Sequence, residues 1–480
     1  MGIIQMIMGG GAGGIDPREH FDVKLYTGNG DSSNAQTGLN FSPDFAWLKP
    51  RSAAYSHNLY DTIRGDNKRL VSNANSAEQT AGFEFQSNGF DPTGSNDNGT
   101  TYVTWAWDAG DAANPTSISA GDYNSSTYNQ SQTWSTAGTA SGTTWAPAVS
   151  TLFNGDISDG PSVWPSGNDG TWTFTSPPTA SSSIKIYCVN ASGSERSGTT
   201  GTYIKLTVSG TDHIINAAAG LMDTGLTGTL DAINITVQSG SGSPGLKYVE
   251  IDGKLLVDDT VTINSPSIAS EYKANPTAGF SIVSYDATGS DLTVGHGLNT
   301  EPALILLKSR NVSGDWLVMH KSAGVTSFLK LNEPNSVVSA SNVFISASST
   351  TFGTGDDSGI NSNNQEKIAY CWSEVEGFSK FGSFASGSNP FVYLGFRPKF
   401  ILFKASGTTG NWDIYDTSRS LYNEANLTIP ANIDQAEYDA GVNGIDILSN
   451  GFKCDGGQNV STTYVYAAWA ESPTKYSNAR

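Results

Sequence analysis

The sequence is poor in cysteine and in charged residues and has no long apolar run, and each shortage excludes a class of protein. Its three cysteines, Cys188, Cys371 and Cys454, are too few and too scattered for a disulfide scaffold. No Cys-x-x-Cys pair or Cys/His cluster is present to hold structural zinc. No apolar run approaches the ~20 residues that a membrane-spanning helix needs. We therefore expect no zinc site and no membrane insertion. The acidic turns at 95–99 and 355–359 either bind calcium through oxygen ligands or are solvated turns, and we favour the second, with no metal site.

Positive charge is also scarce. The chain has 26 Lys and Arg against 45 Asp and Glu, a formal net charge of −19. Binding to nucleic acid or to an anionic membrane needs a basic surface, so we expect no nucleic-acid partner. Charged residues make up 15% of the chain, against a usual ~25%. Gly, Ser, Thr and Asn replace them, a balance typical of β-rich extracellular or virion proteins with many turns.

The N-terminal segment has the composition of an anchor. An apolar stretch from Ile3 to Met8 is followed by the glycine-rich residues 9–14. The stretch lacks the basic residues and the length of a signal peptide. Because exposed apolar segments usually mark interfaces, we expect an N-terminal anchor of residues 1–20, in which residues 1–14 dock in a partner protein or a multimer interface.

A proline-led motif occurs three times along the 480 residues. Each copy has a proline, one variable residue, four mostly apolar residues and a lysine. The copies run from Pro43 to Lys49, from Pro302 to Lys308 and from Pro398 to Lys404. Since apolar residues occupy both odd and even positions, which point to opposite faces of a strand, the motif predicts a β-strand that is buried on both faces. A proline is tolerated at the start of such a strand.

Two further spacings are shared by the copies. An aspartate lies 18 residues after the proline in the first and third copies, and an arginine follows it three residues later. In the second copy this offset falls on His320. An Asn-Gly-Phe turn precedes a tryptophan in the first and third copies, 17 residues after the phenylalanine, and all three copies close on a tryptophan. The residues are Asp61 with Arg64, Asp416 with Arg419, and Trp107, Trp372 and Trp469.

These spacings predict an all-β, multi-domain fold with three repeated β-sandwich-like units and an inserted β domain. The repeats span 21–111, 278–376 and 377–480. Because burial of one sheet face fixes the strand register, we expect the repeats to superpose with their prolines equivalent. Residues 112–170, rich in Ser, Thr, Gly and Asn, are expected to form a connecting segment. Residues 171–262 are expected to form the inserted domain, which ends in a hairpin turning at Asp252-Gly253.

Several segments resemble an uncharacterised repeat of marine bacteriophage tail-fibre and other virion proteins, those of cyanophages especially. They are residues 26–30, 41–49, 60–65, 102–107, 250–258 and 391–398. The resemblance covers most of the chain except about 112–165. It implies a structural role in a virion and a contribution to host attachment, and it carries no catalytic signature.

The charged motif residues have two interpretations each. The lysines Lys49, Lys308 and Lys404 either form a binding site or extend from a buried strand to water, and we favour the second. The pairs Asp61–Arg64 and Asp416–Arg419 are either acid sites or structural ion pairs. Identical spacing in repeated units indicates a requirement of the fold, so we favour structural pairs.

Recognition of a host glycan is expected from loops of the last repeats. The candidates are Asn411 and Trp412, which follow Lys404, and Asn459 in a later loop. They offer amides beside aromatic rings, which suits neutral sugars. The alternative is that these are ordinary surface turns.

The leading functional hypothesis is a non-enzymatic virion protein of a tail fibre or adhesion device, without catalytic residues or cofactors. Its expected partners are other virion proteins, further copies of the chain with a trimer favoured, and a host glycan or envelope protein. Two alternatives stay open: a capsid decoration or head-fibre protein, and a secreted polysaccharide-degrading enzyme. For an enzyme, two carboxylates ~5–9.5 Å apart would suffice.

Overall fold

The computed structural model describes most of the chain and contains strands almost throughout. The described residues are 15–120, 128–146, 148–155, 164–165, 169–190, 203–215, 220–236, 244–261, 265–387, 389–441, 444–454 and 462–472. Within these ranges the only helices are two short 3₁₀ turns, η1 (Pro17–Glu19) and η2 (Val149–Phe153). None of the described helical segments is long and apolar enough to span a membrane. The expected all-β class is confirmed.

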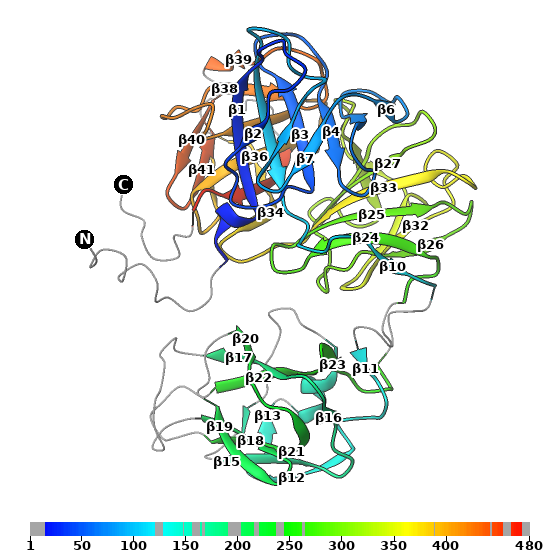
Figure 1. Cartoon of the computed structure of the whole chain (residues 1–480), viewed down its shortest axis with the longest axis vertical. Helices are drawn as coiled ribbons and strands as arrows, with labels where there is room; N and C mark the ends of the chain where they lie inside the picture. The colour runs from blue at the N-terminus through cyan, green and yellow to red at the C-terminus, as the bar shows by residue number, and fades with distance from the viewer. Residues whose placement is uncertain are drawn as a thin grey trace. The chain divides into compact units, whose positions relative to one another are not determined.

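The described residues fall into two compact units. The large unit contains those between 15 and 120 and between 266 and 472, and the inserted unit contains those between 121 and 265. In Figure 1 the large unit brings together strands coloured blue, green to yellow, and orange to red, which come from the three sequence repeats.

Each repeat pairs a long sheet with a three-stranded sheet, and the strand order is the same in all three. In repeat one the long sheet is β1 (Phe21–Thr27), β9 (Thr101–Trp107), β3 (Phe45–Pro50), β4 (Asn58–Asp61), β5 (Lys68–Val71) and β6 (Gln79–Thr80). Its short sheet is β2 (Gln36–Thr37), β8 (Gly89–Asp91) and β7 (Glu84–Gln86).

Repeat two follows this order and adds two strands at one edge. Its long sheet is β10 (Thr116–Ile118), β24 (Ser270–Asn275), β25 (Phe280–Asp286), β33 (Glu366–Trp372), β27 (Leu304–Ser309), β28 (Leu317–His320), β29 (Ser327–Lys330) and β30 (Val338–Ser339). Its short sheet is β26 (Leu292–Gly295), β32 (Thr351–Thr354) and β31 (Phe344–Ala347).

Repeat three has the order of repeat one, strand for strand. Its long sheet is β34 (Ser379–Ala385), β42 (Thr463–Ala470), β36 (Pro398–Ala405), β37 (Trp412–Asp416), β38 (Leu427–Pro430) and β39 (Tyr438–Asp439). Its short sheet is β35 (Phe391–Tyr393), β41 (Gly451–Cys454) and β40 (Ile445–Leu448).

The strand that follows each proline is buried on both faces, as its sequence predicts. In β3 every residue is buried. Ala46 and Leu48 pack against the short sheet of the same repeat, whereas Phe45 and Trp47 enter a core that all three repeats share. The apolar residues of both parities are therefore explained by two different cores.

Three tryptophans meet in the shared core. Trp107, Trp372 and Trp469 are at most 2% exposed, and each contacts the other two edge to face with ring centroids 5.5–5.9 Å apart. Aromatic rings favour this geometry. Since the repeats close around one core, the segments 21–111, 278–376 and 377–480 are three copies within one compact unit and not separate domains.

The inserted unit is a second sandwich. Its two large sheets are β11-β23-β22-β17-β20 and β12-β15-β21-β18-β19, with β16 (Thr179–Ala180) beside β21, and β13 (Trp145–Ala146) pairs with β14 (Trp164–Pro165) in a small third sheet. Their bounds are β11 (Tyr128–Asn129), β23 (Lys254–Leu256), β22 (Pro244–Ile251), β17 (Ile184–Asn190), β20 (Gly220–Asp223), β12 (Gly138–Gly142), β15 (Asp169–Phe174), β21 (Gly228–Thr236), β18 (Tyr203–Val208) and β19 (Thr211–Ile215). Asp252 and Gly253 form the expected two-residue turn between β22 and β23, with φ of 52° and 78°.

Two expected boundaries differ from the structure. Trp134, Trp145 and Phe153 belong to the core of the inserted unit, so this part of 112–170 folds with that unit and does not form a separate connector. The first 14 residues of the expected anchor lie outside the described residues. Of the remaining anchor residues, Ile15 packs on the shared core of the large unit.

Candidate functional site

The two Asp–Arg motifs are buried ion pairs that also join neighbouring repeats. In both pairs the two side chains are 0% exposed. The carboxylate of Asp61 accepts a hydrogen bond from the hydroxyl of Tyr370 in repeat two, 2.6 Å away. The carboxylate of Asp416 accepts one from Nε1 of Trp105 in repeat one, at 3.0 Å. These groups are inaccessible to a substrate, and their role is structural.

The third interface carries a compensating pair of substitutions. Trp105 and Tyr370 stand two residues before the core tryptophans, and the corresponding residue in repeat three is Ala467, which has no side-chain donor. There His320 replaces the aspartate, and its Nε2 donates to the main-chain oxygen of Tyr466 at 3.0 Å. Burial lowers the pKa of His320 to about 4, so the imidazole is neutral at pH 7.

The three motif lysines are buried, and the expectation that they extend to water is wrong. Lys49, Lys308 and Lys404 are at most 1% exposed. Each ammonium group donates to main-chain oxygens of its own repeat and of the next one: Asp434 at 3.3 Å, Asn75 at 3.4 Å and Pro334 at 2.8 Å respectively. Burial lowers the pKa of all three to about 8.

A third set of equivalent contacts shows that the repeats form a closed ring. Trp316 of repeat two donates to the main-chain oxygen of Val71 in repeat one, and Trp412 of repeat three donates to that of Lys330 in repeat two, both at 2.8 Å. His57 of repeat one donates to the carbonyl of Pro430 in repeat three at 2.9 Å. Each repeat therefore contacts the next in the same direction, and the third contact closes the cycle.

These contacts correct the expected glycan site in the last repeat. Trp412 is 1% exposed and holds two repeats together, so its ring cannot stack on a sugar. The neighbouring Asn411 accepts a hydrogen bond from Asn432 at 2.9 Å. Asn459 lies outside the described residues. Of the described candidates, Trp412 thus lacks the open ring face that the expected site required.

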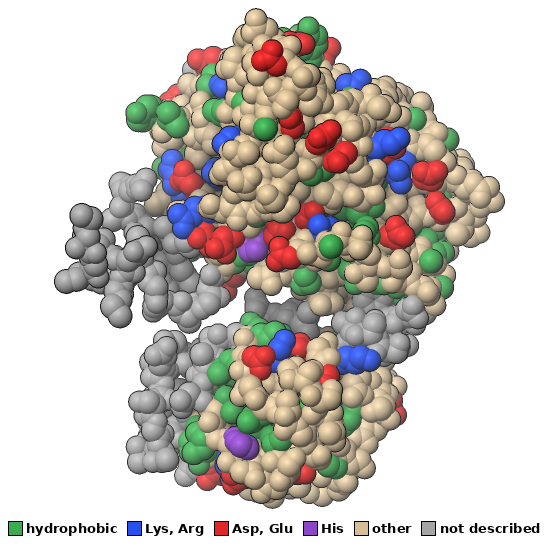
Figure 2. All heavy atoms as spheres, viewed as in Figure 1, with side chains coloured by type: hydrophobic (Ala, Val, Ile, Leu, Met, Phe, Trp, Pro, Cys, Tyr) green, Lys and Arg blue, Asp and Glu red, His purple; other side chains and the backbone are tan. Residues whose placement is uncertain are grey.

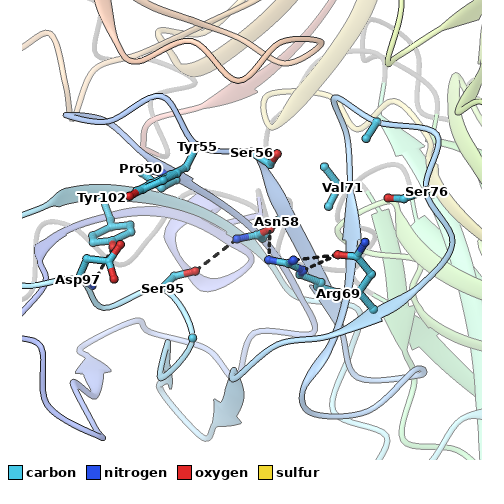
Figure 3. A pocket seen from close by; sticks show the side chains of 13 residues that line it. Pro50, Tyr55, Ser56, Asn58, Arg69, Val71, Ser76, Ser95, Asp97 and Tyr102 are labelled. Atoms are coloured by element: carbon cyan, nitrogen blue, oxygen red, sulfur yellow. Dashed lines mark hydrogen bonds between the residues drawn. The ribbon is translucent and has the colours of Figure 1, made fainter.

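A pocket of about 550 Å³ opens instead in repeat one. Figure 3 shows its centre, where Asn58 of β4 connects Ser95 with Arg69 of β5. Asn58 donates to Ser95 Oγ at 3.3 Å and accepts from Arg69 at 3.4 Å. Arg69 in turn donates twice to Gln79 Oε1 of β6, at 3.1 and 2.8 Å.

Aromatic and apolar groups form another part of the wall. Tyr55, from the loop between β3 and β4, lies beside Pro50 and Tyr102 in Figure 3. It is 53% exposed, so its ring is open to a ligand. Asp97 is the only carboxylate and Arg69 the only cation among the lining residues, so the wall has no net charge.

Three residues of the pocket wall set repeat one apart from repeat two at aligned positions. The β-sheet register aligns Asn58, Arg69 and Gln79 with Leu317, Phe328 and Val338. In repeat two, Leu317 and Phe328 pack into the core of the sandwich. Three polar residues thus replace three apolar ones across neighbouring strands. The replacement is visible when the repeat sequences are aligned. The repeated motifs do not reveal it, because the motifs contain only residues that the repeats share.

Exposed aromatic residues also occur on the short sheet of repeat three. Phe391 and Tyr393 are 49% and 61% exposed on β35. The register aligns Tyr393 with Thr37 of repeat one and Gly295 of repeat two, so the exposed ring is particular to this repeat. On the face shown in Figure 2, charged side chains lie singly or in small groups among uncharged atoms.

Comparison with known proteins identifies a family. The model of the family described as Domain of unknown function (DUF7483) matches residues 16–152 and 232–473. These ranges include the strands of all three repeats and the terminal hairpin of the inserted unit. A search of curated proteins finds no match to the chain.

Proposed function

The chain belongs to the DUF7483 family of domains of unknown function, and we propose that it is a non-enzymatic structural protein of a bacteriophage virion. In this proposal the protein is part of a tail fibre or adhesion device and contributes to host attachment. Its partners are other virion proteins, bound through the N-terminal segment, and further copies of the chain, most simply in a trimer. The resemblance to phage fibre repeats supports this assignment.

One structural observation carries the proposal. The lysines, the Asp–Arg pairs and the core tryptophans that recur in the sequence are all buried, and they hold three sandwiches in a closed ring. Charged residues that recur for a catalytic purpose would face a cleft that substrate can enter. Residues that join repeats instead make a rigid body that carries surface loops, as an attachment protein requires.

Labelling of purified phage particles tests this proposal. Antibodies against the full chain should mark tail fibres in electron micrographs, and particle digests should contain its peptides. Label on the head would favour a capsid decoration or head-fibre protein. Absence from particles, together with shortening of host polysaccharide by the purified protein, would replace the proposal with the enzyme alternative.

A further inference from the structure

We infer that the pocket of repeat one binds a neutral saccharide. The inference rests on the proposed attachment function and names the ligand class and the site. The pocket has a volume of about 550 Å³, within the ~300–1,000 Å³ that is usual for small-molecule sites.

The wall offers hydrogen-bond donors and acceptors together. Carboxamides supply both in one side chain, and serine hydroxyls do the same. Asn58, Gln79 and Ser95 therefore suit a ligand that carries many hydroxyl groups, each of which donates and accepts. Asn58 and Gln79 use part of this capacity within the wall, and an amide group has further donor and acceptor sites for a ligand hydroxyl.

Charge excludes anionic ligands as the preferred class. Arg69 and Asp97 balance each other among the lining residues. Moreover, Arg69 directs Nε and Nη2 at Gln79 Oε1 and Nη1 at Asn58 Oδ1, so its guanidinium fork is already engaged. Phosphate and carboxylate ligands are held by an arginine fork that is free to bind them bidentately.

Tyr55 supplies the stacking surface that sugars use. Its ring is 53% exposed at the edge of the pocket, in the loop after β3. An aromatic ring beside amides and hydroxyls can pack on the C–H face of a pyranose while the polar groups bind its hydroxyls. Neither Gly314 nor Gly410, the glycines in the corresponding loops of repeats two and three, offers such a ring.

The test uses the full chain on an array of neutral, uronic-acid and sulfated oligosaccharides, followed by calorimetric titration of the tightest neutral sugar. Tyr55→Ala should lower its affinity about tenfold, the loss of one stacking contact. Tyr393→Ala, at a similarly exposed tyrosine of repeat three, should leave affinity unchanged. The triple variant Asn58→Leu, Arg69→Phe, Gln79→Val installs the residues of repeat two and should abolish binding.

Several results would overturn the inference. These are binding of charged oligosaccharides only, binding of no sugar, or a neutral sugar that both pocket variants bind as well as the wild type does. Because Tyr55 is a surface residue, its variant remains informative if the triple variant does not fold. The two proposals fail separately. A protein that is found in particles but binds no sugar would contradict only the saccharide site. A protein that binds a neutral sugar but is absent from particles would contradict only the virion role.

Discussion

At the residue scale, the buried ion pairs show how charge is used in this protein. The side chains of Asp416 and Arg419 are fully buried, 2.5 Å apart, and the guanidinium also lies over the ring of Trp105. Removal of one partner from a buried pair leaves an uncompensated charge and is strongly destabilising. The pair therefore holds together two repeats, because Trp105 belongs to repeat one and the pair to repeat three.

Arg419→Met should lower the free energy of unfolding by about 3–5 kcal/mol. Adding Asp416→Asn should restore part of that loss, because the charge is removed while an oxygen remains to accept from Trp105. Denaturant unfolding measures both. Arg18→Met, in a pair whose arginine is 54% exposed, is the control and should cost no more than about 1 kcal/mol. Equal effects of Arg18→Met and Arg419→Met would contradict the structural role.

The acidity of Asp413 gives a pH-dependent prediction. Burial raises the pKa of this carboxyl to about 6, against the attraction of Lys404. The unfolded carboxyl has a pKa near 3.8, so between pH 4 and 6 the folded chain binds more protons than the unfolded one. This group's contribution to the free energy of unfolding therefore falls as pH rises through that window, by about 3 kcal/mol in all.

Asp413→Asn should remove this fall and stabilise the protein at pH 7 by up to about 3 kcal/mol. Asparagine is the residue that repeat one carries at the aligned position, Asn58, so the fold accommodates it. Denaturant unfolding of both proteins at a series of pH values measures the difference. Parallel stability curves for the two proteins would show that the carboxyl does not titrate as described.

At the element scale, the strands that sequence patterns could predict are those with local signals. Proline followed by apolar residues of both parities marked the central strand of each repeat, and Asp252-Gly253 marked a hairpin. The burial of Lys404 and Trp412 could not be predicted from such local patterns, because a neighbouring repeat buries both side chains. Burial by a distant segment leaves no periodicity in the strand that is buried.

The Asn-Gly-Phe segments show a different limit. The turn itself is formed by Ser449 and Asn450, and Gly451 already belongs to β41. A Cβ on Gly451 would lie 2.0 Å from the carbonyl oxygen of Val392 in β35. The glycine is thus required by the close approach of two strands, whereas the sequence pattern indicated only a turn.

Gly451→Ala should therefore separate β35 from β41 and cost about 1–3 kcal/mol, the usual range for overpacking. Gly387→Ala is the matched control, because a Cβ there meets nothing within 4 Å. That variant should be neutral or slightly stabilising, since alanine restricts the unfolded chain. Thermal unfolding compares the two, and equal midpoints would contradict the steric role.

At the scale of the whole molecule, three sequence repeats form one ring instead of a string of domains. Sequence comparison revealed the copies, and their shared core was not visible in it, because Trp107, Trp372 and Trp469 meet only after the chain has closed. The same comparison, applied position by position, separates residues that hold the ring from residues particular to one copy. Asn58, Arg69 and Gln79 belong to the second class, and for that reason they are candidates for function.

Differential scanning calorimetry of the full chain tests this ring most directly. We predict one transition for the described residues of the large unit, with an enthalpy of roughly 200 kcal/mol near 60 °C at ~0.7 kcal/mol per residue. Trp107→Ala should move that whole transition down by about 5–8 °C, because the core loses a large side chain that all repeats share. Separate transitions of roughly 65 kcal/mol for each repeat, with only one of them shifted by Trp107→Ala, would contradict the account.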